Sequence, residues 1–153
     1  MEGFKHVKKE GSNYVVKQYM ALQHIIGIAW VGISILLITY TDYLKTGIVL
    51  LIFSLLITIV SFIPPKVNFD MENQLLTVTN SGLNRKRFIF NLNDFEGFEL
   101  QTFRMGFLPL GCYLYANFKN VSKLKRPLVS QSFTQKKMQE IVNELEDIHV
   151  KVK

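Results

Sequence analysis

The sequence predicts a membrane-embedded helical hairpin followed by an α+β domain. Two apolar runs without a charged residue, Gln18–Thr41 and Thr46–Pro65, lie close together near the start of the 153-residue chain. Polar and apolar residues then alternate along much of residues 66–133, which is typical of strands. The C-terminal residues repeat apolar side chains at helical spacing. These observations separate a hairpin region from a folded region.

Each apolar run is long enough to cross a bilayer. A helix rises about 1.5 Å per residue, so about 20 residues span the hydrocarbon core. The core helix of a soluble protein carries charges on its outer face, and neither run has one. We expect helices at about 20–41 and 46–63, joined by the loop Asp42–Lys45. A second span follows the first at once, so the hairpin at 21–63 is expected to be retained rather than cleaved as a signal peptide.

The placement of charge predicts the orientation of this hairpin. Lysines precede the first run and basic residues follow Pro65, whereas Lys45 in the connecting loop is balanced by Asp42. The positive-inside rule then puts both termini in the cytoplasm. The net charge of +6 is explained by flanks beside an anionic leaflet, and no basic helix points to nucleic acid as a partner. Abundant lysine and asparagine indicate a bacterial chain, so the expected location is the bacterial cytoplasmic (inner) membrane.

Small residues form a potential helix-packing seam. They recur every seven positions, at Gly27, Ser34 and Thr41 in the first run and at Gly47, Ser54 and Ser61 in the second. A spacing of seven returns to nearly the same helix face. With a turn centred on Leu44, Gly27 lies opposite Ser61, Ser34 opposite Ser54, and Thr41 opposite Gly47. We expect this seam to let the two backbones approach closely.

Trp30 lies near the middle of the first run, an unusual depth for a residue that prefers the membrane interface. Thr58 is its expected opposite residue in the second helix. We predict that the indole N–H donates to a hydroxyl of Ser54, Thr58 or Ser61, because an unpaired donor in hydrocarbon is costly. The alternative is that Trp30 faces lipid or another subunit.

The folded domain is expected at residues 66–153, with residues 1–20 as a cytoplasmic N-terminal segment. The conformation of Phe4–Lys9 stays open between a free tail, a strand and a short helix. Alternation and turn signals predict about six or seven strands. The clearest strand patterns cover residues 67–70, 74–80, 85–92, 97–104, 111–118 and 127–133. A proline pair, Pro64-Pro65, leads straight into this domain without a flexible linker.

A C-terminal helix is predicted after the N-cap residue Thr134. One apolar stripe follows, made of Met138, Ile141, Val142, Leu145 and Ile148. A sheet of this size cannot bury a core by itself. We therefore expect the stripe to close an antiparallel sheet.

This order of elements resembles that of bacterial membrane proteins in which two transmembrane helices precede a pleckstrin-homology-like domain. The resemblance covers essentially the whole chain through the PP stop, NFDMENQLLTVTNSG, RKRFIFNLNDFEGFEL and the helix after SFTQKK. It implies a curved antiparallel sheet or partly open barrel closed by the C-terminal helix, and no enzymatic activity. It does not imply an inositide pocket. Eukaryotic lipid-binding versions place basic residues around the first hairpin turn, where this chain has Asp70-Met71-Glu72-Asn73.

No spacing of residues predicts catalysis or metal binding. His6, His24 and His149 are scattered along the chain, Cys112 is the single cysteine, and no glycine-rich loop follows a strand. Asp94, Glu96 and Glu99 are interpreted as turn and outward strand positions rather than as an acid–base group. We therefore expect no catalytic residue, no metal and no cofactor.

Two kinds of surface remain as candidate contacts. The basic clusters Arg85-Lys86-Arg87 and Lys123-Leu124-Lys125-Arg126 lie near turns and could contact an anionic surface or be solvated loop ends. Residues 105–111 are predicted to be a loop carrying Phe107, Leu108 and Leu110. That loop is open to three interpretations: buried core, contact with the membrane interface, or contact with a partner.

These observations predict a non-enzymatic, membrane-anchored adaptor or accessory subunit. Its hairpin and domain would contact a protein partner, either an integral-membrane protein or a second copy of the chain. The alternative is a module that recognises anionic lipid headgroups. A homo-oligomeric pore is the least favoured function, because the apolar runs offer few polar positions.

Overall fold

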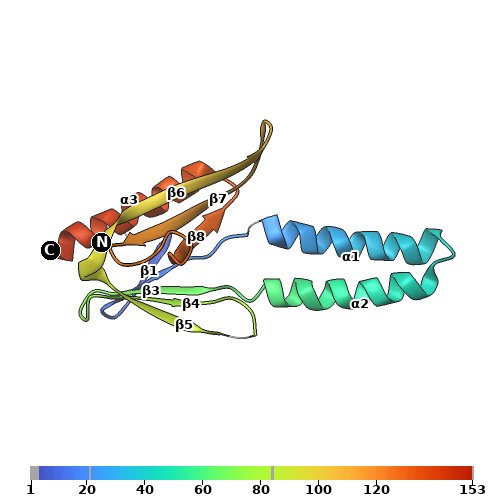
Figure 1. Cartoon of the computed structure of the whole chain (residues 1–153), viewed down its shortest axis with the longest axis horizontal. Helices are drawn as coiled ribbons and strands as arrows, with labels where there is room; N and C mark the ends of the chain where they lie inside the picture. Colours follow the sequence, from blue (N-terminus) through green and yellow to red (C-terminus); the bar gives the residue numbers. More distant parts are fainter. Residues whose placement is uncertain (1–3, 21, 84, 153) are drawn as a thin grey trace.

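A computed structural model of the chain describes residues 4–20, 22–83 and 85–152. Figure 1 shows two antiparallel helices that extend from one end of a β-rich domain. The helices are α1 (Leu22–Tyr40), α2 (Leu44–Ser61) and α3 (Gln135–Val152), with a short 3₁₀ turn at Leu92–Asp94. The strands are β1 (Val7–Glu10), β2 (Asn13–Val16), β3 (Lys66–Asp70), β4 (Leu75–Thr79), β5 (Arg87–Asn91), β6 (Phe95–Met105), β7 (Leu108–Phe118) and β8 (Leu128–Ser132).

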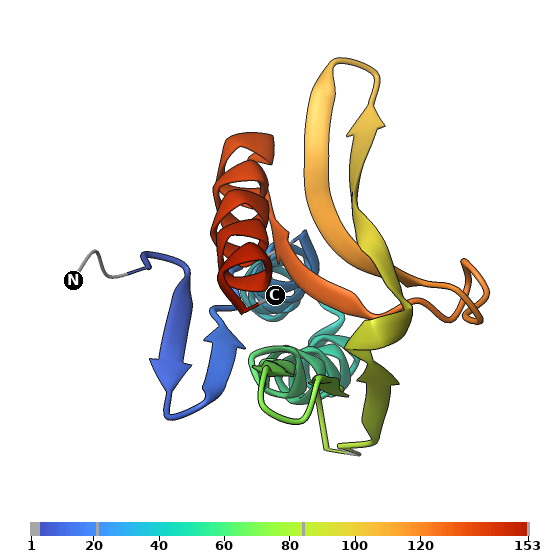
Figure 2. The ribbon, with the colours of Figure 1, turned by 90° about the vertical axis from the view of Figure 1, so that its left-hand side faces the viewer.

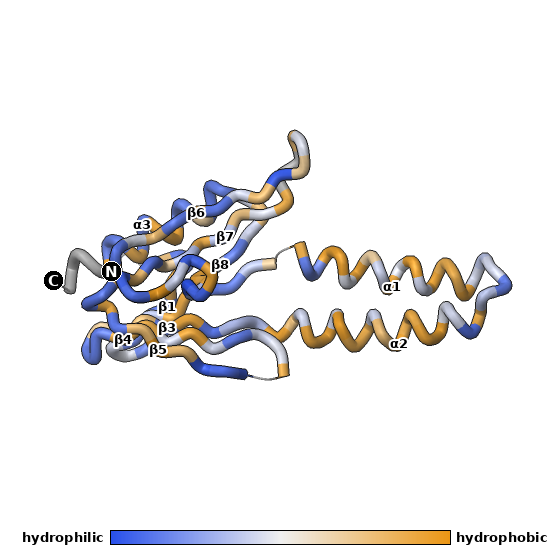
Figure 3. The backbone as a smooth tube through the Cα atoms, viewed as in Figure 1, coloured by the Kyte–Doolittle hydropathy of each residue, from blue (hydrophilic) through white to orange (hydrophobic). Residues whose placement is uncertain are grey.

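The two long helices are apolar and contact each other along their length. α1 has 19 residues and α2 has 18, and both are long and apolar enough to cross a membrane. At about 1.5 Å per residue each is roughly 27–29 Å long, close to the thickness of a bilayer core. Figure 3 shows the hydrophobic character of both helices and the polar loop that joins them. The predicted helical hairpin is confirmed, with α2 beginning at Leu44 rather than at residue 46.

The N-terminal segment belongs to the folded domain. β1 and β2 form a hairpin around Gly11, whose φ of +69° favours glycine. β2 then pairs antiparallel with β3, so the first sheet has the order β1-β2-β3-β4-β5. Residues 7–16 are therefore part of the domain rather than of a separate segment, and a domain boundary at residue 66 omits two strands. The α1–α2 hairpin is an insertion between two neighbouring strands of one sheet.

A second sheet and α3 complete the domain. β6, β7 and β8 form an antiparallel sheet of three strands, and α3 packs against β7 and β8 (Figure 2). Aromatic side chains join the two sheets: the rings of Phe90 and Phe118 stack at 5.1 Å, and Phe69 lies edge-on to Phe98 at 6.3 Å. The six strands predicted in residues 66–133 are present, each shifted by at most a few residues.

The core lies between the two sheets and α3. All five residues of the predicted C-terminal stripe are buried, which confirms that this face of α3 covers the sheets. Val7 and Val16 from the N-terminal hairpin are buried in the same core, together with Val67 of β3. Burying one such side chain contributes about 1.5–3 kcal/mol. The N-terminal strands therefore contribute to the stability of the domain.

Candidate functional site

The seam between α1 and α2 is formed by small residues at which the helices approach closely. Gly27, Ser34, Gly47 and Ser54 are buried there. A Cβ atom at Gly27 would lie 2.7 Å from the Thr58 hydroxyl oxygen, so Gly27 faces Thr58 rather than Ser61. The pairing is thus shifted by about one helical turn from the prediction.

The cause of this shift is the position of the turn between the helices. α1 ends at Tyr40 and α2 begins at Leu44, so the turn is centred before Leu44. A Cβ atom at Gly47 would lie 2.6 Å from Cγ1 of Ile38, and Thr41 is exposed beyond the end of α1. A shift of three or four residues keeps the same helix face, so the seam keeps its small residues.

Trp30 does not lie in this seam. Its side chain is 49% exposed, and none of the described residues accepts a hydrogen bond from its indole N–H. The hydroxyls of Ser54, Thr58 and Ser61 each donate to a carbonyl oxygen of α2 itself. Serine and threonine often satisfy their hydroxyls in this way within a helix. The predicted hydrogen bond from the Trp30 indole N–H to a hydroxyl of α2 is therefore absent among the described residues. Trp30 instead faces outward, which was the alternative interpretation.

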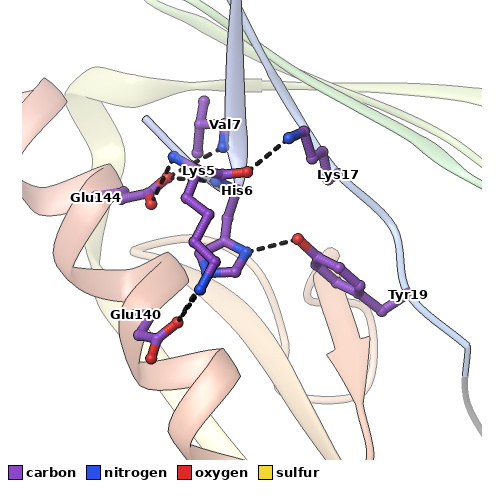
Figure 4. A network of polar contacts seen from close by, with 7 residues as sticks. All are labelled: Lys5, His6, Val7, Lys17, Tyr19, Glu140 and Glu144. Atoms are coloured by element: carbon purple, nitrogen blue, oxygen red, sulfur yellow. Dashed lines mark hydrogen bonds and ion pairs between the residues drawn. The ribbon is translucent and has the colours of Figure 1, made fainter. Parts of the chain in front are cut away.

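A polar cluster ties the N-terminal strand to the C-terminal helix (Figure 4). The buried ring of His6 lies 2.5 Å from the hydroxyl of Tyr19 through Nδ1 and 2.9 Å from a carboxylate oxygen of Glu140 through Nε2. The hydrogen bond from His6 holds the pKa of Glu140 below its ordinary value of 4.5. Burial raises the pKa of Tyr19, and the carboxylates of Glu144 and Glu140 raise it further.

Glu144 of α3 completes this cluster, which we call the terminal clasp: Lys5, His6, Val7, Lys17, Tyr19, Glu140 and Glu144. Its carboxylate accepts hydrogen bonds from the backbone N–H groups of Lys5, His6 and Val7 at 2.9, 2.9 and 3.1 Å. Lys17 Nζ donates to the carbonyl oxygen of Lys5 at 2.6 Å. The clasp therefore holds β1 on α3 and fixes Tyr19, which lies shortly before α1.

His6 was not singled out by the sequence, because it lies in a short segment that looks like a polar tail. The available signal was Gly11 between two short runs, the first beginning with Val7 and the second ending in Val16, which is the pattern of a hairpin. Gln18 gives a further attachment, since its Nε2 donates to the carbonyl oxygen of Val129 in β8 at 2.9 Å. The chain that enters α1 is thus bonded to both sheets and to α3.

Two loops of the domain reach the level at which α1 begins and α2 ends (Figure 1). We call them the helix-side rim: the β4–β5 loop, described at residues 80–83 and 85–86, and the β6–β7 tip, residues 103–107. In the first loop Leu83 is 82% exposed and is followed by Arg85 and Lys86, which are exposed. A Cβ atom at Gly82 would lie 3.4 Å from Val60, so this loop lies beside the end of α2.

The β6–β7 tip is a strand hairpin rather than a long loop. β6 runs to Met105 and β7 begins at Leu108, so only Gly106 and Phe107 form the turn. Phe107 is 92% exposed and Met105 is 64% exposed, which excludes the buried-core interpretation for these two residues. Leu110 is half-buried, and the side chain of Leu108 lies outside the described residues.

A cavity of about 860 Å³ lies between the two sheets near the helix ends. Its lining combines apolar residues with polar and basic ones: Gln23, Pro65, Val78, Asn80, Ser81, Phe88, Phe90, Asn120, Val121, Ser122, Lys125, Arg126, Pro127, Leu128 and Gln131. Gln131 is only 4% exposed, and its side-chain amide has no hydrogen bond to any described residue. This combination of apolar walls with a few polar groups is typical of small-molecule sites.

The predicted basic clusters differ in their freedom to bind a ligand. Arg85, Lys86 and Arg87 are exposed, as are Lys123 and Lys125. Arg126 is instead largely buried. Its guanidinium lies 2.6 Å from the Glu99 carboxylate and 4.3 Å from the centre of the Tyr115 ring. This hydrogen bond lowers the pKa of Glu99, so Arg126 acts as a structural residue.

Within the described residues, no three His, Cys, Asp or Glu side chains gather in a way that could hold a metal ion. The exposed and hollow surfaces described above are the outer face of the helices, the helix-side rim and the cavity. No family model matches the chain, and no curated protein matches it. The function is accordingly inferred from these surfaces.

Proposed function

We propose that the chain is a non-enzymatic adaptor or accessory subunit of the bacterial cytoplasmic membrane. In this proposal α1 and α2 span the bilayer, the domain lies in the cytoplasm, and an integral-membrane protein contacts the outer face of the helices. The lengths and apolar character of α1 and α2 support the span. The lysines before α1 and the basic residues after α2 support the orientation.

The exposure of Trp30 is the single observation on which the proposed protein partner rests. It lies near the middle of α1, its ring is half exposed, and its N–H has no acceptor among the described residues. Tryptophan favours the membrane interface, and an unpaired donor in hydrocarbon costs free energy. A partner helix that covers the ring and accepts from the N–H removes both costs.

The insertion of the hairpin between β2 and β3 makes the domain suitable for an adaptor. Four residues join α2 to β3, and Lys17 and Gln18, which follow β2, are bonded to the domain at Lys5 and Val129. These contacts would keep the domain close to the ends of α1 and α2. Two antiparallel sheets followed by a C-terminal helix also support the resemblance to a pleckstrin-homology-like domain, which presents surfaces for binding without catalysing a reaction.

The test is purification of the full-length protein in mild detergent, followed by mass spectrometry of bound proteins. We expect one stoichiometric membrane protein, with less of it bound by Trp30→Phe and least by Trp30→Ala. Phe53→Ala is the matched control, because Phe53 is also an exposed aromatic residue, on α2. A strictly monomeric wild-type protein without a companion contradicts the proposal, whereas a dimer of this chain changes the partner to a second copy.

Recognition of an anionic lipid is a second candidate, favoured by the cavity between the sheets. Its apolar lining suits an acyl chain, and Gln131 offers an unpaired amide. Lys125 lines the same cavity, and Arg85 is exposed on the helix-side rim. Each basic residue near an anionic surface contributes about 1 kcal/mol.

Native mass spectrometry of the full-length protein with equal amounts of phosphatidylglycerol and phosphatidylcholine tests this second function. We expect preferential retention of phosphatidylglycerol, reduced in a variant that combines Arg85→Ala with Lys125→Ala. Lys136→Ala is the control, since Lys136 is an exposed residue of α3. Equal retention of both lipids by the wild-type protein contradicts lipid recognition and leaves the protein partner unaffected.

A further inference from the structure

We propose that the β6–β7 tip inserts into the interface of the same membrane leaflet that α1 and α2 enter. Met105 and Phe107 would lie among the headgroups and upper acyl chains, and Arg104 would lie beside lipid phosphates. This inference rests on the proposed membrane span. In addition to α1 and α2, the tip would then be a third part of the protein that contacts the bilayer.

The exposure of the tip is the first argument. Among the side chains of this hairpin that the structure describes, Phe107 and Met105 are the two most exposed apolar ones, and Phe103 is half exposed. The turn itself does not require them, because the positive φ of +61° is adopted by Gly106. Apolar residues gathered at an exposed tip indicate a surface that is covered in the working protein.

The level of the tip along the helix axis is the second argument. Figure 1 shows that the tip reaches the level at which α1 begins and α2 ends. Helices of 18 and 19 residues match the bilayer core, so their ends mark its boundary. The strands at the two ends of the hairpin, β2 and β3, pair with each other in the domain that carries the tip.

The surface between the tip and α1 is the third argument. An apolar recess of about 240 Å³ is lined by Leu22 of α1 and by Phe103, Leu110, Tyr113 and Tyr115 of the β6–β7 hairpin. The rings of Phe103 and Tyr113 meet edge to face at 5.2 Å.

Tyrosine is enriched at membrane interfaces, where its ring is apolar and its hydroxyl is hydrated. The recess thus continues the apolar surface from the first turn of α1 towards the tip. Arg104, which is exposed next to Met105, adds a cation on the side where an anionic leaflet would lie. The apolar recess, the tyrosine rings and the exposed Arg104 are better suited to contact with the surface of a lipid bilayer than to exposure to water.

The experiment uses the full-length protein with Cys112→Ala, reconstituted into vesicles of phosphatidylglycerol and phosphatidylcholine. An environment-sensitive fluorophore is attached at Phe107→Cys, and separately at Glu72→Cys. Glu72 is an exposed residue of the β3–β4 turn, at the opposite end of the domain (Figure 1). We expect a blue shift and quenching by shallow lipid-attached nitroxides at position 107 only.

A third label at Ile28→Cys separates the two proposals, because Ile28 is a half-exposed residue within α1. If the label at position 28 is quenched by deep nitroxides and position 107 remains like position 72, the tip proposal is overturned and the span stands. If the label at position 28 has the fluorescence of a water-exposed group, the proposed membrane span is contradicted. A blue shift at position 107 without quenching by lipid nitroxides indicates a protein contact and also overturns the tip proposal.

Discussion

Val16 of β2 and Val67 of β3 are paired in neighbouring strands, although the whole α1–α2 hairpin lies between them in the sequence. Both side chains are buried in the core of the domain. The pairing means that the domain is built from chain on both sides of the hairpin. It also means that the two ends of the hairpin lie side by side.

The first prediction concerns the minimal folded domain. Joining residues 1–19 to residues 65–153 through a short glycine–serine linker should give a soluble, folded protein, because antiparallel neighbours can be joined by a short turn. This design retains Tyr19 and the terminal clasp. Circular dichroism with a cooperative thermal transition measures the outcome.

Residues 66–153 alone are the comparison for this design. That fragment lacks β1, β2 and His6, so the core loses Val7 and Val16. We expect it to aggregate or to unfold without a cooperative transition. A fragment as stable as the joined protein would show that the N-terminal strands are dispensable.

The second prediction concerns the helix seam. Gly47→Ala should destabilise the protein by about 1–3 kcal/mol, because overpacking forces neighbouring groups apart. The added Cβ would lie 3.2 Å from the backbone nitrogen of Ile38, which cannot move without shifting α1. Thermal unfolding of the full-length protein in mild detergent measures this effect.

Gly32→Ala is the matched control, since a Cβ atom at Gly32 meets nothing within 4 Å. Alanine favours the helix over glycine, so this variant should be as stable as the wild type or slightly more stable. If both variants behave alike, the close approach at Gly47 does not hold the helices together.

The third prediction concerns the terminal clasp. Glu144→Ala should speed hydrogen exchange of the Lys5, His6 and Val7 amides, because all three donate to its carboxylate. Hydrogen bonds to charged groups contribute about 1.5–3 kcal/mol, so protection should fall by roughly 10-fold or more. Hydrogen exchange followed by mass spectrometry measures this loss of protection, and Glu146→Ala is the control because Glu146 is exposed. Unchanged exchange at these amides would contradict the clasp.

The fourth prediction concerns acid stability. The pKa of Glu140 is lowered on folding by its hydrogen bond from His6. A lowered folded-state pKa adds stability above the unfolded-state value of 4.5, and this contribution is lost as the pH falls through the folded-state pKa. Glu140→Gln should therefore reduce stability near neutral pH and flatten its decline in acid.

Urea unfolding of the joined domain, measured between about pH 6 and pH 3, tests this prediction. Glu146→Gln is the control, because Glu146 is an exposed residue of the same helix. Glu99 also has a lowered pKa, through Arg126, so part of the acid dependence should persist in the Glu140 variant. An identical pH profile for wild type and Glu140→Gln would contradict the role of the pair.

Elements with strong local patterns could be predicted from the sequence. Long uncharged apolar runs make α1 and α2 evident in the sequence, and the apolar stripe of α3 indicates which of its faces is buried. β1 has no such pattern, because Lys8, Lys9 and Glu10 are exposed at the edge of the sheet. Its place depends on pairing with a distant part of the chain.

The candidate sites depend still more on spatial arrangement. Spacing in the sequence placed Trp30 near the seam, but a large ring does not fit where two backbones are separated by glycine and serine. Arg126 belongs to a basic cluster in the sequence, whereas in the fold its guanidinium lies beside Glu99 and Tyr115. The cavity between the sheets brings together side chains from α1, three strands and three connecting segments, a proximity that no local pattern predicts.

The insertion of the hairpin between β2 and β3 also sets an order for biosynthesis. The first two strands leave the ribosome before α1, yet their partner β3 is made only after α2. The sheet can therefore form completely only after both helices have been synthesised and, in the proposed membrane span, after the chain has returned to its starting side. Under the proposed membrane span, a chain whose second helix fails to cross the bilayer would have β2 and β3 on opposite sides of it. Pairing of β2 with β3 would then require that both helices have crossed.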